Sequence, residues 1–503
     1  MGKQDARPSE FEIKLGLPPG SREALERFPA LAAVRPDRRR EITRYFDTLD
    51  LALARKGFSL RVRTSGNHRI QTLKHTGTHP FQRSEWEWPV EHDRPDVSRL
   101  AATPLAPRVP DLRRELEVVF VADIERSTRR IALDRGAEIE AALDHGRIEA
   151  NGVSVEVNEC ELELKQGPRL PLYRFAIDLH GAVPMWINPE SKSARGYRLR
   201  TGESPAPRHA GKLRLTPKLR LKQAFSLTVT RCLGHILDNV AAADAMEIEG
   251  IHQLRVGLRR LRSALVLFEP AFERSAFDPF ARELRRLGRI FGARRDMDVF
   301  CTEILPAAQH DIASSWVDRL APRADAYRRT MEHGLRQALQ SPGFTGLILG
   351  LAAWCEDGTA DPARVGRSDL GQPLAKVAPR LLDRMARTLA RRSRRIDDPV
   401  AMHDFRKSLK KLRYGAEFFA GLYDKADVKR YHKRCAALQD VLGAINDARV
   451  AARLAEDLAD GPGMELAPAA AALAAWSAGR EQRALAKLAK AQASFNEVPP
   501  FWR

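Results

Sequence analysis

The segment HQLRVGLRRLRS (residues 252–263) returns 151 residues later as HDFRKSLKKLRY (residues 403–414). In both copies a histidine is followed by basic residues at the same spacing. The aligned pairs are His252 and His403, Arg255 and Arg406, Arg259 and Lys410, Arg260 and Lys411, and Arg262 and Arg413. The same offset places Leu287, Gly292 and Asp296 opposite Leu438, Gly443 and Asp447. Two signatures in one register predict a duplicated helical unit.

The first of these segments has the spacing of an amphipathic α-helix. Its leucines stand at positions 254, 258, 261 and 265, on one helix face, and its histidine and arginines occupy an adjoining stripe. The helix should therefore bury its leucines and present a row of cations beside them. Ala-rich and Arg-rich segments continue toward the C-terminal end, where VPPFWR (498–503) is predicted to form a loose tail.

The length and composition of the chain suggest where its domains begin and end. At 503 residues the chain exceeds the usual single core, so two or three domains are expected. Residues 201–218 are rich in proline and glycine, which is typical of a linker. We predict an N-terminal domain at 1–203, a linker at 204–220 and an all-α domain at 221–495. Two related bundles of about four helices are expected within it, at about 221–340 and 370–490.

The positive charge is concentrated in the C-terminal part. The formal net charge is +19, and residues 1–203 contribute only +3 of it, from 34 Lys and Arg against 31 Asp and Glu. A polycation attracts phosphate-rich polymers or anionic membranes without choosing between them. The helical rows lack interleaved aromatic residues and no helix-turn-helix motif is evident, so we rank nucleic acid below polyphosphate as a partner.

Cysteine usage and hydropathy bear on the compartment. Five cysteines are scattered without paired spacing, which indicates reduced thiols and neither a disulfide framework nor a metal site. The N-terminal residues lack the apolar stretch of a signal peptide, and no segment approaches the length of a membrane span. We therefore expect a cytoplasmic protein without membrane insertion.

The N-terminal part alternates with a period of two, which indicates β-strands. The segments FEIKL, SLRVRT, RIQTLKH, SEWEWPVE, EIEAAL and NECELELK have this pattern, and their polar positions carry mostly Glu, Arg and Lys. An antiparallel sheet with a charged outer face would explain any one such strand. Many strands of this kind favour a closed barrel, with aliphatic residues outside under flanking helices and charges around a hydrated interior.

Paired carboxylates on these strands point to metal-assisted chemistry, because two glutamates at i and i+2 offer adjacent oxygen donors to Mg²⁺ or Mn²⁺. Glu10 and Glu12 form an early pair, and a late pair lies among Glu159, Glu161 and Glu163. All three late glutamates share a face, so the partner of Glu161 stays open. The charged residues between them are Arg61, Arg63, Lys74, Glu85, Glu87, Arg126, Arg130, Glu140 and Asp144. Phosphoryl transfer uses this mixture, and no Walker A or GxGxxG loop is present.

The segment EFEIK (10–14) has the ExExK form of the CYTH domain, the triphosphate tunnel metalloenzyme fold. Further motifs follow in that family's order: YFDT (45–48), LRVR (60–63), TLK (72–74), SEWE (84–87), ALDHG (142–146), ELELK (161–165) and SKSARGYRL (191–199). About residues 8–200 therefore resemble a CYTH domain. The resemblance implies an antiparallel eight-stranded β-tunnel with flanking helices, and an α+β class for the whole chain.

The resemblance also implies an enzyme that hydrolyses a triphosphate in the tunnel with Mg²⁺ or Mn²⁺. The residues implied for catalysis are Glu10, Glu12, Lys14, Lys74, Glu161 and Glu163, of which the four glutamates would hold the metal. The residues implied for phosphate binding are Arg61, Arg63, Arg126, Arg130, Lys192 and Arg195. Arg130, Glu140, Asp144 and Arg195 are second-choice members of the site. Family members of similar architecture hydrolyse tripolyphosphate to pyrophosphate and phosphate, so an inorganic triphosphatase is the leading hypothesis.

The C-terminal part resembles the CHAD domain, a helical module with duplicated HxxRxxxRRxR-like signatures that is associated with polyphosphate binding. The resemblance implies long-chain polyphosphate contacts from His252, Arg255, Arg259, Arg260, Arg262, His403, Arg406, Lys407, Lys410, Lys411 and Arg413. The two halves need not bind equally, because the second copy replaces two arginines by lysines, which weakens a planar bidentate grip. It also has Asn446 where the first copy has Arg295. Asp296 and Asp447 are expected to orient cations or cap helices.

Two alternatives to the inorganic triphosphatase stay open. The tunnel could act on an organic triphosphate such as ATP or thiamine triphosphate. The chain could also be a non-catalytic polyphosphate-binding protein associated with polyphosphate granules. Paired carboxylates argue against this second alternative, because they add nothing to pure anion binding unless they hold a metal.

Overall fold

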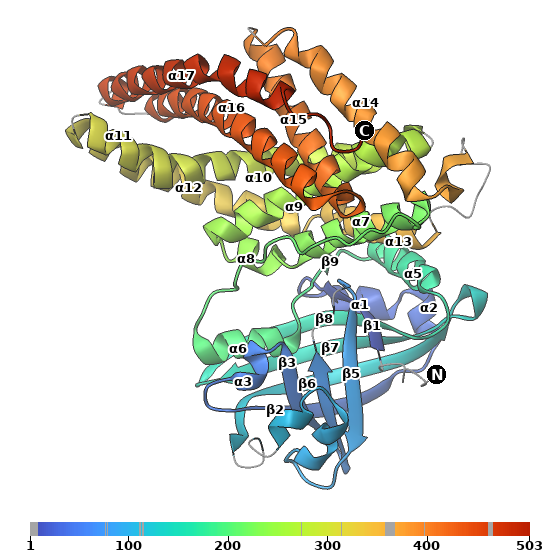
Figure 1. Ribbon diagram of the computed structural model, residues 1–503. Helices are drawn as coiled ribbons and strands as arrows, with labels where there is room; N and C mark the ends of the chain where they lie inside the picture. The colour runs from blue at the N-terminus through green and yellow to red at the C-terminus, as the bar shows by residue number, and fades with distance from the viewer. Residues whose placement is uncertain are drawn as a thin grey trace. The chain divides into compact units, whose positions relative to one another are not determined.

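The computed structural model describes residues 9–75, 77, 79–109, 112, 115–272, 274–312, 314–357, 368–396, 398–460 and 466–503. The chain divides into two compact units (Figure 1). The first unit comprises Met1–Pro207, Leu237–Glu247 and Leu339–Asp357, and the second comprises Arg208–Ile236, Ile248–Ala338 and Gly358–Arg503.

Eight antiparallel strands of the first unit close into a barrel, as the described residues show (Figure 1). They are β1 (Ser9–Gly16), β2 (Asp37–Asp47), β3 (Phe58–Ser65), β4 (His68–His75), β5 (Gln82–Pro89), β6 (Glu117–Ala132), β7 (Glu138–Ala150) and β8 (Val153–Gln166). Their order is β5-β4-β3-β2-β6-β7-β8-β1, and the ring closes where β1 also pairs with β5. The predicted eight-stranded antiparallel barrel is confirmed.

The two faces of each strand differ in chemistry, and this difference explains the closed form. On β1, Ile13 and Leu15 are fully buried outside the barrel, whereas Glu10 and Lys14 line its interior. The outer face is covered by short helices and by one longer helix. These elements are α1 (Ser21–Glu26), α2 (Pro29–Ala32), α3 (Ala52–Arg55), η1 (Val97–Ala102), η2 (Ala106–Arg108) and α5 (Arg169–Ala182). The helix α6 (Lys192–Thr201) instead packs against Phe120, the inward-facing neighbour of Tyr45, and its Lys192 lines the cavity. The aliphatic outer face thus packs under helices, as the alternation predicts.

A helix from the C-terminal half of the sequence packs within the barrel unit. The helix α13 (Pro342–Asp357) lies between the two helical copies in the chain, yet it packs against α5 and the two-residue strand β9 (Trp186–Ile187). The Ile187 amide donates to Thr345 Oγ1 at 3.0 Å, and β9 pairs in turn with Leu15 and Gly16 of β1. The short helix α8 (Val240–Asp244) also belongs to this unit. Both segments lie inside the range 221–495 that the sequence predicts to be the all-α domain.

The second unit repeats one order of helices. Its first copy contains α7 (Leu221–Leu237), α9 (Ile248–Phe268), α10 (Asp278–Val299), a π-helical turn η6 (Phe300–Ile304), α11 (Leu305–Asp311) and α12 (Ser314–Leu339). Its second copy contains α14 (Leu374–Ser393), α15 (Pro399–Phe419), α16 (Lys425–Ala459) and α17 (Ala467–Asn496). The offset of 151 residues places α10, η6 and α11 opposite the single long helix α16. The signatures lie on α9 and α15, so the predicted helical duplication is present in the described residues.

The C-terminal residues differ from the predicted loose tail. Trp502 is only 3% exposed, its indole N–H donates to Asp383 Oδ1 at 3.0 Å, and Arg503 Nε donates to the same oxygen at 3.0 Å. The Phe501 ring meets Tyr431 edge-on at 5.5 Å between centroids. The prediction was wrong because it relied on the two prolines and gave no weight to Phe501 and Trp502. The packing of these aromatic side chains stabilises the docked C-terminal end.

No single helix among the described residues has both the length and the hydropathy of a membrane span. Only the later part of α12 and α13, taken together, meet these criteria by length and composition.

The bond between Ile187 and Thr345 gives a stability prediction. In a Thr345→Val chain the buried Ile187 amide loses its acceptor, which costs about 1–3 kcal/mol. We expect a lower melting temperature by differential scanning calorimetry of the full chain, with recovery in Thr345→Ser. Thr228→Val is the matched control, because Thr228 is equally buried but its hydroxyl only donates to Ala224 O on its own helix. Equal losses in both valine variants would contradict the assigned role of Thr345.

Candidate functional site

The inward faces of the strands surround a cavity of about 520 Å³. Among the described residues, its walls carry nine Lys or Arg side chains and eight Asp or Glu side chains. The cations are Lys14, Arg39, Arg61, Arg63, Lys74, Arg83, Arg126, Lys165 and Lys192. The acids are Glu10, Asp37, Glu41, Glu85, Glu87, Glu140, Glu161 and Glu163. A cavity with walls of both signs can hold an anion together with its counter-cation.

Strand register brings the carboxylates together. Glu12 on β1 lies directly opposite Glu163 on β8, and Glu163 lies opposite Glu140 on β7. Directly opposed side chains in an antiparallel pair are close neighbours, and like charges there destabilise the sheet. Two residues further along β1, Lys14 lies opposite Glu161. The row of three carboxylates therefore requires compensation from cations.

Two lysines supply part of this compensation. Lys14 Nζ lies 2.8 Å from Glu12 Oε1 and 2.8 Å from Glu161 Oε1. Lys74 Nζ lies 2.5 Å from Glu10 Oε2 and 3.2 Å from Glu85 Oε1. Each of these lysines is thus shared between two carboxylates. Glu161 is also bound by Arg126 and Lys192, and Glu85 lies 3.9 Å from Arg61, whereas Glu12 depends on Lys14.

The pKa values of the acids differ according to this compensation. Burial alone would raise the pKa of Glu10, but the Lys74 ammonium, followed by Lys14, lowers it to about 2. Burial, followed by the charge of Glu161, raises the pKa of Glu12 to about 7. Burial also raises the pKa of Glu163 and of Glu85. Negative charge around Glu12 and Glu163 is therefore incompletely neutralised.

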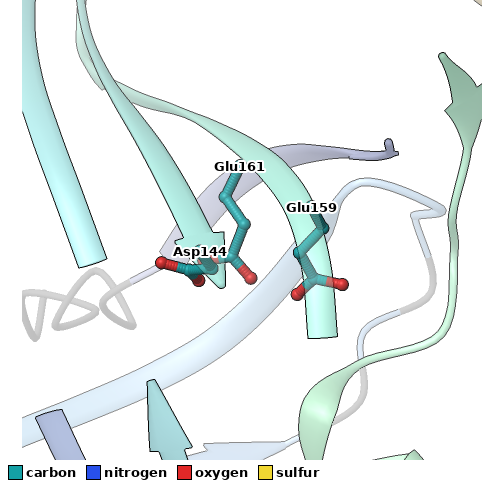
Figure 2. A group of neighbouring side chains, drawn as sticks. All are labelled: Asp144, Glu159 and Glu161. Carbon is teal, nitrogen blue, oxygen red and sulfur yellow. The ribbon is translucent and has the colours of Figure 1, made fainter. Parts of the chain in front are cut away.

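A second group of carboxylates is fully neutralised. Oxygens of Asp144, Glu159 and Glu161 lie within 4.8 Å of one another, and Figure 2 shows these three side chains on β7 and β8. Lys192 Nζ lies 2.6, 2.5 and 2.8 Å from one oxygen of each, in that order. We refer to Asp144, Glu159 and Glu161 as the carboxylate cage. An ammonium group, that of Lys192, lies between its three carboxylates.

Two arginines complete the neutralisation of the carboxylate cage. Arg126 binds Asp144 with both Nε and Nη2, at 2.7 and 2.5 Å, and reaches Glu161 Oε2 at 2.6 Å. Arg195 is paired with Glu159. Burial by itself would raise the pKa values of Asp144 and Glu161. The neighbouring cations nevertheless hold the pKa of Asp144 below its usual value and that of Glu161 well below it. Three cations therefore balance three carboxylates.

Glu159 and Glu163, the two possible partners of Glu161 in the sequence analysis, lie in different surroundings. Glu159 is 0% exposed and is held by Lys192, Arg195 and Asn188 Nδ2. Glu163 lines the cavity and lies opposite Glu12. Glu163 is therefore placed to meet a ligand in the cavity, whereas Glu159 is enclosed.

The structure brings most of the predicted site residues together. The cavity wall includes Glu10, Lys14, Arg61, Arg63, Lys74, Arg126, Glu161, Glu163 and Lys192. Glu12 lines a small adjoining pocket together with Glu10 and Lys14. Neither Arg130 nor Arg195 is part of the described cavity wall. Arg130 has a side chain that is 62% exposed and paired with Glu138 at 2.8 Å, and Arg195 is buried beside Glu159.

Strand β2 contributes a part of the site that the motifs did not indicate. Glu41 accepts from Arg39 Nε at 2.7 Å and lies 3.4 Å from Arg63 and 3.7 Å from Arg126. Tyr45, four residues further along the strand and the first residue of the YFDT motif, also lines the cavity. No clear signal in the sequence indicated Arg39 and Glu41, because residues 37–41 (DRRRE) are charged at every position and precede the motif.

The donor set fits a hard divalent cation. Glu10, Glu12, Glu161 and Glu163 offer carboxylate oxygens, which Mg²⁺ and Mn²⁺ both prefer. The raised pKa of Glu12 agrees with this fit, because it arises from burial first and then from the charge of the neighbouring Glu161 carboxylate. A divalent cation here would relieve the repulsion. Nothing in the donor set favours one of the two metals over the other.

A separate group of cations lies in the second unit, where α9 and α15 pack together. We call Arg255, Arg259, Arg406 and Lys410 the cationic cluster. Burial, followed by the charges of Arg406, Arg259 and Arg255, lowers the pKa of Lys410 to about 6. Burial, followed by the charge of Arg259, lowers the pKa of Arg255 to about 10. The two signatures therefore contribute to one cluster whose positive charges repel one another.

Among the described residues, the cationic cluster is faced by Asp296, Asn446, Asp447 and the Tyr414 hydroxyl, which accepts from Arg259 Nη2 at 3.2 Å. Arg255 lies 3.9 Å from Asp296, and Arg406 Nη1 donates to Asn446 Oδ1 at 3.0 Å. The Nε atoms of Arg259 and Arg406 are buried without a hydrogen-bond partner among the described residues. Unpaired buried donors beside surplus positive charge are the features expected of an anion-binding site.

The remaining signature residues lie in different surroundings. Arg260 is buried between the helices, 2.5 Å from Glu417 and stacked over Phe418 at 5.2 Å. Burial lowers the pKa of His252 to about 4, and its Nδ1 has no partner among the described residues. Residues on the same stripe are His403 and Lys407, both exposed, and Arg262, Lys411 and Arg413, all partly buried. Arg260 thus stabilises the helix pair, while the others stay near solvent.

Two family models match the chain in succession. The CYTH domain model matches residues 9–197, and the CHAD domain model matches residues 228–456. The barrel with its charged cavity is thus a CYTH tunnel, and the helical unit carries a CHAD domain. The chain therefore belongs to the proteins in which a CYTH domain is followed by a CHAD domain.

Two known proteins are similar to parts of this chain. The inorganic triphosphatase of Haemophilus influenzae is 28% identical over 159 residues, which is 31% of this chain and 44% of that protein. The chain thus matches less than half the length of that relative. The crystal structure of the CHAD domain from the plant Ricinus communis is similar with a TM-score of 0.53 and 31% identity, covering 58% of this chain and 98% of that one.

The raised pKa of Glu12 predicts a pH-dependent stability of the metal-free protein. Between about pH 4.5 and 7 the unfolded chain loses this proton while the folded chain keeps it, so stability falls as the pH rises. We therefore expect Glu12→Gln in EDTA to be about 1–3 kcal/mol more stable than the unaltered chain at pH 8, with no gain near pH 4. Urea unfolding at both pH values measures this difference. Glu125→Gln, an exposed glutamate on β6, is the control, and a loss of stability in Glu12→Gln at pH 8 would contradict the prediction.

Proposed function

We propose that the barrel is a metal-dependent inorganic triphosphatase and that the helical unit binds polyphosphate. One observation supports the first part above all others. Glu10, Glu161 and Glu163 line one cavity together with phosphate-binding cations, Glu12 lines a small adjoining pocket, and the charge around Glu12 and Glu163 is incompletely neutralised. The relative from Haemophilus influenzae, an inorganic triphosphatase, supports the same reaction class.

In this proposal the cations of the wall hold the phosphate chain. Arg61 and Arg63 on β3 face the cavity from one side, and Arg126 on β6 from another. Their guanidinium groups suit bidentate contacts with phosphate oxygens, while Lys14 and Lys74 act as point charges. Mg²⁺ or Mn²⁺, held by Glu10, Glu12, Glu161 and Glu163, would neutralise non-bridging oxygens.

The same residues account for the hydrolytic step. A water molecule attacks the terminal phosphorus, the bridging P–O bond breaks, and pyrophosphate leaves with phosphate as the second product. Glu163 is suited to take the proton of this water, because it lines the cavity and its pKa is raised by burial. Cations that hold the leaving pyrophosphate stabilise the charge that develops on it.

The wall favours an inorganic substrate over a nucleotide or thiamine ester. Among the described lining residues, the rings are those of Tyr45 and His68. Tyr45 is 2% exposed and packs against Phe120, so it offers no open face on which a base could stack. The remaining wall is charged or hydroxylated apart from Ile70.

A triphosphate panel tests the barrel's activity. We expect tripolyphosphate to be hydrolysed faster than ATP or thiamine triphosphate with either Mg²⁺ or Mn²⁺, and no turnover in EDTA. Glu10→Gln and Glu163→Gln should each reduce kcat by at least about a hundredfold, because each removes a carboxylate that acts on the reacting groups. The control Glu125→Gln makes the same change on an exposed position and should retain activity.

Three outcomes would overturn this part of the proposal. Faster turnover of an organic triphosphate would assign a different substrate. Phosphate release that persists in EDTA would remove the metal. Absence of hydrolysis, with tight binding of polyphosphate by the unaltered chain and by Glu10→Gln, would favour a non-catalytic binding protein.

The helical part of the proposal rests on the cationic cluster. Arg255 and Arg259 come from the first copy, and Arg406 and Lys410 from the second, so one polyanion would be held by both copies at once. Binding would relieve the repulsion that lowers the pKa of Lys410. A linear chain of phosphates supplies several charges along one molecule, which suits a row of cations.

Substitution of Lys410 separates binding from stability. In Lys410→Met the repulsion disappears, so we expect an unchanged or higher melting temperature but at least about tenfold weaker polyphosphate binding, since a charge-assisted contact is worth about 1.5–3 kcal/mol. Fluorescence anisotropy at several salt concentrations measures the affinity and its salt slope. Arg430→Met on α16 is the charge-matched control, because Arg430 is exposed and pairs with Asp427 on its own helix. Unchanged affinity in Lys410→Met would remove the cluster from the site.

A further inference from the structure

We propose that Lys192 acts as a tethered cation that keeps divalent metal away from Asp144 and Glu159 of the carboxylate cage and confines it to the side of the tunnel formed by Glu10, Glu12, Glu161 and Glu163. The inference rests on the metal dependence proposed above. It assigns Lys192 a role in selecting the metal position, which differs from the phosphate contact that the CYTH resemblance implies.

The geometry of the cage supports this role. Asp144, Glu159 and Glu161 are the described residues that could jointly offer three ligand atoms to one ion (Figure 2). Lys192 Nζ lies 2.5–2.8 Å from an oxygen of each of them. A metal ion could enter only after the ammonium had left. The displaced ammonium would then need another acceptor in a buried place, and an unpaired buried charge is strongly destabilising.

The position of Lys192 is fixed by the helix that carries it. Lys192 is the first residue of α6, and Ser191 caps the helix by accepting from the Ala194 amide at 3.1 Å. Gly196 lies so close to the Phe120 ring that a Cβ atom there would overlap it. Tyr197 also donates to Asp47 at 2.9 Å. The helix is therefore seated on the barrel wall, and its lysine cannot be withdrawn by a simple rotation of α6.

The charges of the two carboxylate groups differ in a way that favours the other side for metal. The cage holds three carboxylates against Lys192, Arg126 and Arg195. Glu12 has Lys14 as its cationic partner and shares it with Glu161. Glu163 has Lys165 at 2.6 Å, and Lys165 also lies 3.6 Å from Glu140. A divalent cation therefore gains more attraction beside Glu12 and Glu163 than inside a neutral cage.

The first test locates the metal in the full chain without using activity. Mn²⁺ is titrated into metal-free protein, and free Mn²⁺ is followed by electron paramagnetic resonance. We expect Asp144→Asn and Glu159→Gln to leave the number of bound Mn²⁺ ions unchanged and the affinity within about twofold. Glu12→Gln and Glu163→Gln should weaken binding at least about tenfold. Loss of a Mn²⁺ ion in Asp144→Asn or Glu159→Gln would overturn the proposal.

The second test removes the tethered cation. Lys192→Met should bind one Mn²⁺ ion more than the unaltered chain, and its melting temperature should rise more on addition of Mn²⁺. The double variant Lys192→Met with Glu159→Gln should lose the additional ion again. Arg198→Met, on the same helix and paired with Glu190 at 2.8 Å, is the matched control and should bind as the unaltered chain does.

These measurements separate the inference from the proposed function. A folded Lys192→Met chain that binds no additional Mn²⁺ would overturn the inference even if tripolyphosphate is hydrolysed. The expected Mn²⁺ pattern without any hydrolysis would support the inference and count against the triphosphatase. If Lys192→Met does not fold, the Asp144→Asn and Glu159→Gln titrations decide the question by themselves.

Discussion

The barrel depends on the mutual neutralisation of charged side chains that the strand period turns inward. A closed sheet encloses these side chains, so each carboxylate must find a cation within the cavity or lose its own charge. Glu161 illustrates the constraint, because Lys14, Arg126 and Lys192 all contact its carboxylate. Leaving such a charge unpaired in a buried place costs several kcal/mol. The aliphatic outer faces can pack under helices only where this inner network holds together.

Neutralisation is uneven, and the unevenness indicates where ligands belong. The three carboxylates of the carboxylate cage are neutralised by three cations. Glu12 and Glu163 have lysine partners that are shared with other acids, so their negative charge is only partly neutralised. The second unit has the opposite imbalance, since burial and then surplus positive charge lower the pKa values of Arg255 and Lys410. In the proposed function, a divalent cation would add positive charge beside Glu12 and Glu163, and a phosphate chain would add negative charge beside Arg255 and Lys410.

The alternation and the family motifs anticipated the face on which each charge lies, because a strand has only two faces. They did not anticipate depth or partners. Arg126 and Arg130 share a face of β6, yet Arg126 lies in the cavity wall and Arg130 is exposed near the strand end. Arg260 belongs to the basic signature, yet it is buried against Glu417. Glu41 and Arg39 were missed because residues 37–41 are all charged and show no alternation, and no recognised motif included them.

The sequence by itself determined the class of each unit: a period of two with charged alternate positions yields a barrel with a polar interior, and a duplicated basic signature at helical spacing yields paired helices with cations beside a buried stripe. Only the tertiary structure decided which carboxylates are satisfied and which are not, because that depends on neighbours from strands distant in the chain. Glu159 and Glu163 are equivalent in the sequence pattern, but the packing of α6 encloses the first with Lys192 and leaves the second in the cavity. Registry and depth arise from closure of the sheet, and closure is a property of all eight described strands together.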